Sequence, residues 1–433
     1  MAADVAKATN GLLNGQNAHL SGVGFDTRSL RPGQLFVPIV AERDGHDFIE
    51  AAIAAGAGAY LTTGRTYGRT SITVPNTLDA LLQLGAWGRN KLDAQLNNRV
   101  VGITGSVGKT STKDFIAAAL GSALKVAANE RSFNNDQGLP VTILNASDDV
   151  EALVLEMGMR GFGEIARLCE IARPNIGVIT KVAHAHTERV GDIDGVARAK
   201  SELVTSLNAS GIAILNADDE RVVAMKSLTQ AAVITYGVSA AADVRMVKCE
   251  LDDKACASVV VESPWGKISW TMNVPGEHMA HNAVAAIAVA GVLGLDTQRA
   301  ADAITKSELS AMRMQHRTAH NGALIIDDSY NANPESMAAA LRALNATKAS
   351  RRIAVMGVMA ELADPVHDHL LIAQLAKQLD IELFAIETDL YGVKSQSLAD
   401  VVSQLNSVDQ SAAILIKGSR VAQLERLVQQ LVK

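Results

Sequence analysis

Apolar runs of strand length alternate with stretches of helical spacing along most of the chain. The runs at 152–155, 213–215 and 412–416 contain only apolar residues, which is typical of strands buried on both faces of a parallel sheet. Between such runs, apolar residues recur three and four positions apart, as they do over 196–207. The alternation predicts an α/β fold in which most strands are parallel.

The same pattern divides the 433 residues into three α/β domains, which suits a usual domain size of roughly 150 residues. We place these domains at 1–95, 96–309 and 310–433. The third repeats the strand and helix order of a doubly wound sheet. Between residues 257 and 274, apolar and polar residues alternate around Trp265-Gly266, which predicts a small antiparallel ribbon.

One stretch, RVVGITGSVGKTSTKDFIAAALG at 99–121, has the order strand, glycine loop, Lys-Thr and helix. Glycines allow backbone N–H groups to approach phosphates, and the helix N-terminus adds partial positive charge. Lys109 would reach the β- and γ-phosphates of a nucleotide, and Thr110 would offer its hydroxyl to Mg²⁺. The alternative is a glycine-rich turn that binds nothing. The residues expected to hold the phosphates are Gly105, Ser106, Gly108, Lys109, Thr110 and Ser111.

The loop departs from the common eight-residue pattern, because Ile103 stands where the first glycine is usual. The match is therefore to the shorter form TGxxGK[ST]. Strand, loop and helix still follow each other in the order that phosphate binding requires.

The overall composition indicates a soluble globular chain, with 48% hydrophobic and 20% charged residues. The net charge of −6 argues against nucleic acid as a partner. Three cysteines without metal-ligand spacing favour a reducing compartment. The first residues lack a signal-peptide pattern, and the longest apolar run, 283–295, is too short to span a bilayer. We therefore expect a cytoplasmic protein without membrane insertion.

Several polar residues follow predicted strands at their carboxyl ends. Glu156 ends the run 152–155 and is a candidate Mg²⁺ ligand, the alternative being a glutamate that faces solvent. His184 and His186 follow the strand expected at 176–180, where they are either ligands or merely solvated. The sequence leaves these alternatives open for the two histidines.

A lysine lies on the apolar face of a predicted helix. Lys200 follows Val196 by four positions and precedes Leu203 by three, so it shares the buried stripe of the helix at 196–207. Such a lysine usually extends to solvent or pairs with a carboxylate, for which Glu202 and Glu156 are candidates. The other interpretation is a lysine that is modified or charge-paired at an active site.

Other polar clusters border apolar runs without a clear chemical pattern. Asp26-Thr27-Arg28 and Asp44-Gly45-His46 are either ligand contacts or turn and cap residues. Asn134 and Asn135 belong to a polar loop, SFNNDQGLP, that is either a substrate contact or a turn.

Seven motifs in order resemble the Mur ligase family, cytoplasmic ATP-dependent amide ligases of peptidoglycan synthesis, and most closely its MurF type. They are DTRSLRPGQLFVPIVAERDGHDFI, GITGSVGKTSTK, SFNNDQGLP, VLEMGMRGFGEI, VARAKSEL, IIDDSYNANPESM and LIKGSR. The resemblance covers nearly the whole chain. It implies an N-terminal UDP-sugar-binding domain, a central P-loop ATPase-like domain and a Rossmann-like C-terminal domain.

The resemblance also implies roles for individual residues. Lys109, Glu156, His186, Lys200 and Arg313 would be catalytic. ATP would contact the glycine loop together with Asn282, Arg313, Asp328 and Asn331. Two Mg²⁺ ions would be held by Thr110, Glu156, His186 and Lys200, the lysine as a carbamate formed with CO₂. The UDP-sugar peptide would contact Asp26, Thr27, Arg28, His46, Asn134 and Asn135.

In this family type, the carboxylate of UDP-N-acetylmuramoyl-tripeptide attacks the γ-phosphate of ATP, and the amine of D-alanyl-D-alanine displaces phosphate from the acyl phosphate. We expect a monomer acting on these small molecules. Two rival functions remain. A MurE-type ligase would add the third amino acid, but its DNPR motif is absent from the sequence. A non-catalytic nucleotide-binding homologue is favoured only by the unusual loop residues Lys181 and His184 and by the altered segment GVMAELAD, with Val358 and Ala363.

Overall fold

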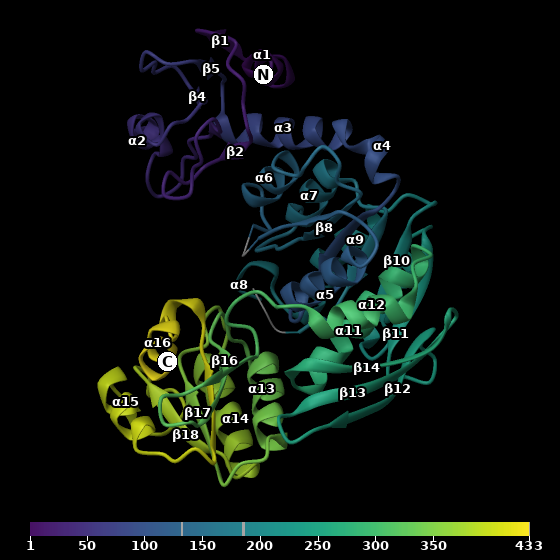
Figure 1. The fold of residues 1–433 in the computed structure, drawn as a ribbon, viewed down its shortest axis with the longest axis vertical. Coiled ribbons are helices and arrows are strands. Elements are labelled where there is room, and N and C mark those ends of the chain that lie inside the picture. The colour runs from purple at the N-terminus through teal and green to yellow at the C-terminus, as the bar shows by residue number, and fades with distance from the viewer. Residues whose placement is uncertain (131–132, 184–186, 433) are drawn as a thin grey trace. The chain divides into compact units, whose positions relative to one another are not determined.

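The computed structural model describes residues 1–130, 133–183 and 187–432 (Figure 1). It is an α/β structure with three sheets, as the apolar pattern predicts. By its internal contacts the chain forms two compact units. Unit 1 holds 1–102, 124–159 and 163–175, and unit 2 holds 103–123, 160–162 and 176–433. The domain boundaries expected after residues 95 and 309 stay a prediction.

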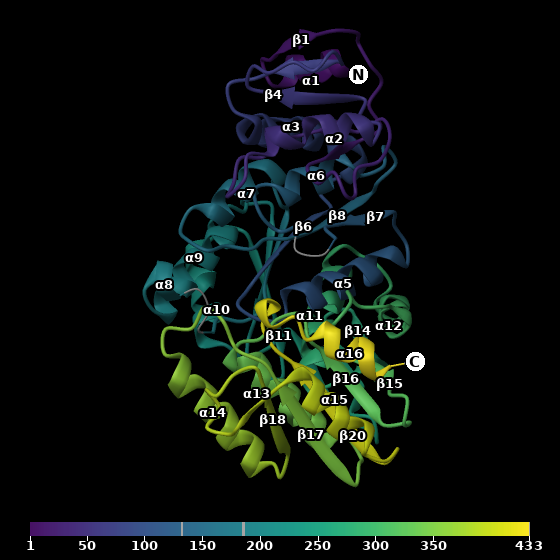
Figure 2. The same cartoon turned by 90° about the vertical axis from the view of Figure 1, so that its left-hand side faces the viewer.

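The N-terminal sheet lies in unit 1. Its strand order is β1-β5-β4-β3-β2, and all neighbours are parallel except β1 and β5. The strands are β1 Leu12–Asn14, β2 Val23–Gly24, β3 Leu35–Phe36, β4 Ala59–Thr62 and β5 Ser71–Thr73. The helices are α1 Ala2–Ala8, α2 Ile49–Ala54, α3 Thr77–Lys91 and α4 Asp93–Leu96, with the 3-10 turn η1 Gly45–Phe48. Leu81 and Leu84 of α3 are buried with Leu61 and Ile72 of the strands, and Figure 2 shows α3 along the sheet.

The central sheet has nine strands in the order β14-β13-β12-β11-β10-β9-β6-β8-β7, and the division between the units falls within β6. In unit 1 the elements are β7 Val126–Ala128, α6 Gly138–Leu144, β8 Ala152–Glu156 and α7 Glu164–Ala172. All residues of β6 (Val100–Thr104) and β8 are buried, as their uninterrupted apolar runs predict. The Gly-rich loop follows β6, and Glu156 is the last residue of β8.

In unit 2 the central sheet changes from parallel to antiparallel. The parallel strands are β9 Ile176–Ile179, β10 Ile212–Asn216, β11 Ala232–Gly237 and β12 Val244–Leu251. The antiparallel strands β13 Cys256–Ser263 and β14 Gly266–Pro275 form the predicted ribbon, with Trp265 at its turn. β12 also pairs antiparallel with β13 and extends the ribbon to three strands. The sequence pattern did not predict strand β12, because several of its residues are exposed and break the alternation of apolar and polar positions.

The helices of this part of unit 2 are α5 Lys109–Gly121, α8 Thr187–Val190, α9 Ile193–Thr205, α10 Glu220–Ala224, α11 Glu277–Val292 and α12 Thr297–Lys306, with the turn η2 Met225–Leu228. α11 packs against both α5 and α12. Eleven of its residues are buried, which explains why its sequence is apolar on all sides. The helix that follows the glycine loop is therefore packed against a largely buried neighbour.

The C-terminal sheet, in unit 2, has the order β15-β16-β20-β17-β18-β19 and is parallel except at β15. The strands are β15 Gln315–Thr318, β16 Leu324–Asp328, β17 Arg351–Met356, β18 Glu382–Ile386, β19 Ser395–Gln396 and β20 Ala412–Lys417. Figures 1 and 2 show α13 Pro334–Ala346 and α14 Pro365–Gln378 on one face, and α15 Leu398–Asn406 and α16 Glu425–Leu431 on the other. The turn η3 Arg420–Ala422 precedes α16. This is the expected doubly wound arrangement.

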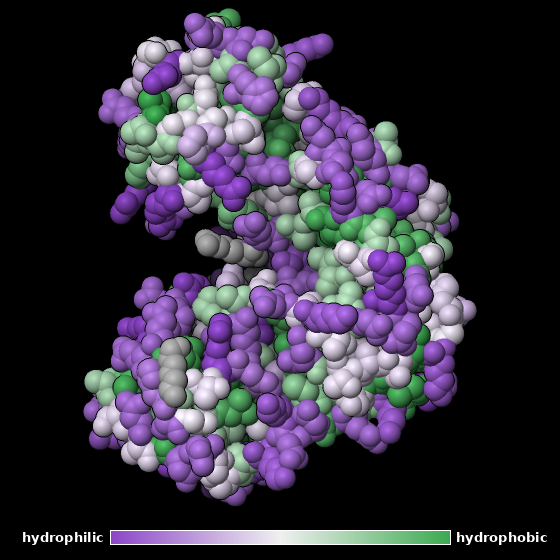
Figure 3. Space-filling model, viewed as in Figure 1, coloured by the Kyte–Doolittle hydropathy of each residue, from purple (hydrophilic) through white to green (hydrophobic). Residues whose placement is uncertain are grey.

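Hydrophilic side chains dominate the face drawn in Figure 3, and apolar ones form small groups on it. Within the described ranges, none of the helices has the length and apolar character needed to cross a membrane. The apolar run at 283–295 instead forms most of the buried helix α11.

Candidate nucleotide-binding site

Both glycines of the predicted phosphate loop have conformations that require glycine. Gly105 has φ +153° and Gly108 has φ +80°, in the region that side chains disfavour. A Cβ on Gly108 would lie 2.6 Å from Oδ1 of Asn282, and one on Gly105 would collide with the hydroxyl of Thr180. Helix α5 begins directly after the loop, at Lys109. The sequence prediction of strand, glycine loop and helix is confirmed.

The ammonium group of Lys109 lies over the loop. It donates hydrogen bonds to the carbonyl oxygens of Gly105, at 2.7 Å, and of Ser106, at 3.2 Å. The first backbone N–H groups of α5 carry partial positive charge at the same place. The structure thus gathers a cation and a helix N-terminus around the loop, an arrangement that stabilises a bound anion.

A segment after β9 braces the loop from the side. The hydroxyl of Thr180 donates to the carbonyl of Val107 at 2.6 Å. Ser106 donates its N–H to the carbonyl of Lys181 at 2.6 Å, and its hydroxyl donates to the carbonyl of Ala183 at 2.9 Å. The N–H of Ala183 returns a hydrogen bond to this hydroxyl. Ser106 therefore fixes the loop, and its predicted contact with nucleotide stays a prediction.

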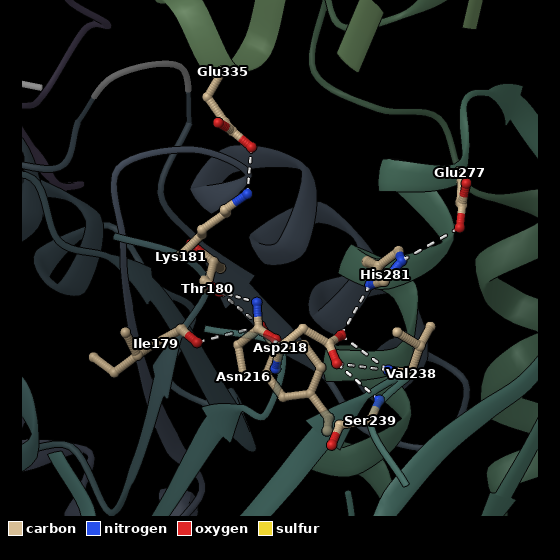
Figure 4. A network of polar contacts seen from close by, with 11 residues as sticks. Ile179, Thr180, Lys181, Asn216, Asp218, Val238, Ser239, Glu277, His281 and Glu335 are labelled. Atoms are coloured by element: carbon tan, nitrogen blue, oxygen red, sulfur yellow. Dashed lines mark hydrogen bonds and ion pairs between the residues drawn. The ribbon is translucent and has the colours of Figure 1, made fainter. Parts of the chain in front are cut away.

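The bracing segment continues into a wider polar network (Figure 4). Asn216 donates to the carbonyl of Thr180 at 2.7 Å. The side chain of Lys181 forms an ion pair with Glu335 at the start of α13. About two fifths of each partner is exposed, so this pair contributes at most about 1 kcal/mol. Lys181 nonetheless links the phosphate loop to the C-terminal sheet's first crossover helix.

On the other side of the network, Asp218 accepts hydrogen bonds from the backbone N–H groups of Val238 and Ser239. Nδ1 of His281 lies 3.6 Å from the same carboxylate. Figure 4 shows the two side chains directed toward each other. Burial alone would raise the pKa of Asp218, but the bonds from His281, Val238 and Ser239 outweigh it and lower that pKa. Neither Asp218 nor His281 was a predicted site residue. Asp218 follows β10 and His281 lies on α11, so their pairing depends on tertiary packing that the sequence pattern does not show.

Arg313 lies close to the phosphate loop, and its contact with phosphate stays a prediction. Its Nη2 lies 3.4 Å from Oγ1 of Thr110, although 203 positions separate the two residues in the sequence. Its guanidinium carbon lies 4.2 Å from the ring centroid of Tyr330. The structure thus brings Lys109, Thr110 and Arg313 together, with Asn282 against Gly108.

Asp328 ends β16 and Asn331 lies in the loop after it, and protein groups occupy part of their bonding capacity. The buried carboxylate of Asp328 accepts from Nζ of Lys417, at 2.5 Å, and from the N–H of Met314, at 3.2 Å. Lys417 also donates to the carbonyl of Asn331. Lys417 thus orders this loop. Nucleotide contacts by Asp328 and Asn331 stay predictions.

Glu156 lies in unit 1, and only 3% of the residue is exposed. The alternative that this glutamate faces solvent is therefore wrong. Asn134 donates to Oε1 of Glu156 at 2.8 Å, and Asn129 holds the strand end through the backbone. Oε2 is buried and has no hydrogen-bond partner among the described residues. A buried carboxylate oxygen without a partner is a suitable ligand for a cation such as Mg²⁺.

Lys200 lies on the buried face of α9, as predicted, with 2% exposure. His186, the other predicted metal ligand, and its neighbour His184 lie outside the described residues. Among the residues that the structure describes, no three His, Cys, Asp or Glu side chains gather into a group that could hold a metal.

The candidate UDP-sugar residues in unit 1 form turns and caps in the structure. Asp26 accepts from the backbone and side chain of Arg28, and this pair is exposed. Asp44 caps η1 and contacts Nδ1 of buried His46 at 2.7 Å. Asn135 accepts from the N–H groups of Gln137 and Gly138. These contacts agree with the turn-and-cap alternative. Binding of a UDP-sugar by these residues, with Thr27 and Asn134, stays a prediction.

Comparisons with known proteins identify the family of the chain. The Mur ligase middle domain matches residues 103–290, and the Mur ligase, glutamate ligase domain matches 312–433. The UDP-N-acetylmuramoyl-tripeptide–D-alanyl-D-alanine ligase of Escherichia coli K12 is 34% identical, over 98% of this chain and 96% of the relative.

Two crystal structures share the fold over nearly their full length. MurF from Acinetobacter baumannii is 27% identical with a TM-score of 0.89, covering 99% of this chain and 98% of that one. MurF from Thermotoga maritima, in complex with ADP, is 25% identical with a TM-score of 0.81, covering 96% and 98%. The chain therefore belongs to the Mur ligase family, and is an ATP-dependent ligase that forms an amide bond.

Proposed function

We propose that this chain joins D-alanyl-D-alanine to UDP-N-acetylmuramoyl-tripeptide with hydrolysis of ATP to ADP and phosphate. The observation that carries the proposal is the meeting of Arg313 and Thr110 beside the glycine loop, 203 positions apart in sequence. The E. coli relative carries the name of this activity and is aligned over 98% of the chain. The motif DDSYNANP, which holds Asp328 and Asn331, is the one expected of this type.

The glycine loop is the proposed site of the ATP phosphates. Lys109 would neutralise the β- and γ-phosphates, and Arg313 would act on the γ-phosphoryl group from the C-terminal side of unit 2. Asn282 lies against Gly108 and is placed to contact the nucleotide near the loop. The ADP bound to the T. maritima relative supports a nucleotide here. Asp328 and Asn331 would complete the nucleotide contacts.

Magnesium would be held by Thr110, Glu156, His186 and Lys200, the last as a carbamate. Oε2 of Glu156, buried and without a hydrogen-bond partner among the described residues, fits a cation, and Lys200 is buried on α9, where the proposed carbamate would form. Addition of CO₂ to the neutral amine would give a carbamate anion and release one proton. When bound, Mg²⁺ supplies positive charge against the phosphate oxygens.

The reaction needs an activated carboxylate, because oxide is a poor leaving group. In the proposed sequence, the tripeptide carboxylate attacks the γ-phosphorus and ADP leaves. The amine of D-alanyl-D-alanine then attacks the acyl carbon, loses a proton, and phosphate leaves. Lys109 and Arg313 stabilise charge on the transferred phosphoryl group, and alignment of the reactants supplies much of the remaining acceleration.

The UDP-sugar peptide would bind residues of unit 1, namely Asp26, Thr27, Arg28, His46, Asn134 and Asn135. A cytoplasmic location and a monomeric state are part of the proposal. Both substrates and ATP are small molecules, so the proposal requires no nucleic acid.

Phosphate release from ATP tests the proposal. We expect release that requires both UDP-N-acetylmuramoyl-tripeptide and D-alanyl-D-alanine, with one amide product formed per phosphate. Release with the UDP-dipeptide and a diamino acid instead would indicate a MurE-type ligase. Nucleotide binding without turnover on either pair would indicate a non-catalytic homologue.

A further inference from the structure

The backbone around Arg313 is held in an unusual conformation. Its two neighbours, Met312 and Met314, have φ angles of +62° and +47°, in the left-handed region that residues with a Cβ disfavour. Local hydrogen bonds maintain this shape: Met312 N–H donates to Gln315, and Met314 N–H donates to the buried carboxylate of Asp328. A disfavoured conformation persists only where the surroundings fix it, so the structure specifies the direction of Arg313.

The start of the same segment is tied to the helix that carries the phosphate loop. Ser310 donates its N–H, at 2.8 Å, and its hydroxyl, at 3.1 Å, to the carboxylate of Asp114 on α5. Asp114 follows Thr110 by one helical turn. The backbone of Arg313 is therefore anchored to the helix whose first residues it faces.

These anchors fix the backbone, but an arginine side chain still has several rotatable bonds. Tyr330 supplies the missing constraint. The guanidinium carbon of Arg313 lies 4.2 Å from the centroid of its ring, and the N–H of Tyr330 donates to the carbonyl of Met312 at 3.3 Å. The ring thus belongs to the same local structure as the arginine backbone.

The hydrogen bonds of the guanidinium agree with this constraint. Nη2 points to Oγ1 of Thr110 at 3.4 Å, whereas Nε is buried and lacks a hydrogen-bond partner among the described residues. Stacking on an aromatic face leaves the in-plane N–H groups of a guanidinium free to donate. With its guanidinium over the ring of Tyr330, Arg313 directs Nη2 toward Thr110 at the loop.

We propose that Tyr330 is a positioning residue: its ring face orients the guanidinium of Arg313 toward the ATP phosphates at the glycine loop. The inference rests on the proposed function, in which Arg313 binds the γ-phosphoryl group. No hydroxyl contact is needed, so the phenyl ring of phenylalanine should replace tyrosine, whereas an aliphatic side chain should not. Since the ring acts through Arg313, its effect disappears when Arg313 is absent.

A double-mutant cycle tests this dependence. Four proteins are compared: wild type, Tyr330→Leu, Arg313→Ala and the double variant. We expect Tyr330→Leu to lower kcat/KM for ATP about tenfold in the wild-type background, as for a partly desolvated cation–π contact, and to change nothing further in the Arg313→Ala background. Tyr330→Phe should stay within about twofold of wild type, because the ring face is kept.

Affinity for the non-hydrolysable analogue AMP-PNP with Mg²⁺ is measured on the same proteins. If wild type shows no turnover with the two substrates, the proposed function fails, and the cycle is then read from AMP-PNP affinity alone. Equal losses in both backgrounds would overturn the positioning role, as would full activity of Tyr330→Leu. If Tyr330→Leu does not fold, Tyr330→Met takes its place in the cycle, and the unfolding midpoint of each variant separates loss of structure from loss of orientation.

Discussion

Lys417 and Asp328 form a buried ion pair, with Nζ 2.5 Å from Oδ2, between the last residues of two neighbouring parallel strands. One partner ends β20 and the other ends β16. The ammonium also donates to the carbonyl of Asn331 at 2.9 Å, so one side chain holds the end of β16 and the middle of the polar loop after it. Burial lowers the pKa of Lys417 in spite of the nearby carboxylate.

Replacement of Lys417 by methionine should destabilise the protein by about 3–5 kcal/mol, because it leaves a buried carboxylate without its partner. Addition of Asp328→Asn to that variant should restore part of the loss, since the carboxylate is then replaced by a neutral amide. Urea unfolding measures both effects. Lys348→Met is the control, because its pair with Asp253 is about three quarters exposed and should change stability little. A loss below about 1 kcal/mol for Lys417→Met would show that the pair contributes little.

The glycine loop offers a matched pair of substitutions. Gly108 and Gly163 both precede a helix with φ +80°, but a Cβ on Gly108 would meet Asn282, whereas one on Gly163 would meet no atom within 4 Å. Alanine should cost roughly 1 kcal/mol of stability at either position because of the backbone conformation. Only Gly108→Ala should weaken ADP binding, by about tenfold or more, because it displaces the loop. Calorimetric titration with ADP distinguishes the two variants, and equal affinities would contradict the assignment of the loop.

Glu156 gives a test in which stability and activity change in opposite directions. Glutamine can keep the bond from Asn134 to Oε1 and removes a buried charge whose second oxygen lacks a partner in the described structure. We expect Glu156→Gln to be as stable as wild type or up to about 1 kcal/mol more stable. Its turnover should require a Mg²⁺ concentration at least about tenfold higher, as for loss of a metal ligand.

The control for this experiment is Glu170→Gln, which changes an exposed glutamate on α7. Turnover against Mg²⁺ concentration and urea unfolding are measured for both variants. A marked loss of stability in Glu156→Gln with an unchanged Mg²⁺ requirement would assign the carboxylate a structural role only.

Stability at mildly acid pH should depend on His278. Burial lowers its pKa to about 4, an effect that Lys417 and His281 reinforce and Asp328 opposes. The folded chain therefore binds fewer protons than the unfolded chain between pH 4 and the usual histidine pKa near 6.5, and stability falls as pH drops through that window. His278→Gln should reduce the fall between pH 6.5 and 4.5 by about 1–2 kcal/mol in urea unfolding. His320→Gln is the control, because His320 is exposed. If His278→Gln has the same dependence of stability on pH as wild type, His278 is not the source of the acid destabilisation.

Local patterns predicted a large part of this fold. The sequence around Lys109 specifies strand, loop and helix within one short stretch, and the apolar run before Glu156 specifies a buried strand. The stripe containing Lys200 predicted both its helix and its burial. In each case the signal lies within one short stretch of neighbouring residues, as the spacing of apolar residues or as the order of glycines and Lys-Thr.

The contacts that complete the site could not be predicted in this way. Thr180 and Gly105 follow two different strands, β9 and β6, and meet only in the folded chain. Arg313 contacts Thr110 although 203 positions separate the two residues in the sequence. Tyr330 was visible inside the motif DDSYNANP, but only the structure shows its ring beside a guanidinium. Such pairs depend on tertiary packing, which leaves no periodic signal in one sequence.

Lys200 provides the test of the proposed carbamate. Lys200→Ala should remove most turnover, and high bicarbonate should not restore it, because alanine has no amine to react with CO₂. A second readout is independent of activity: protein equilibrated with ¹³C-labelled bicarbonate should show a carbamate ¹³C resonance that is absent in Lys200→Ala. Lys226→Ala, on the short turn η2, serves as the control and should keep both the resonance and the activity. If Lys200→Ala turns over as fast as wild type, or if it keeps the carbamate resonance, the carbamate is not part of the mechanism. Lys200 would then be a buried lysine with a different role.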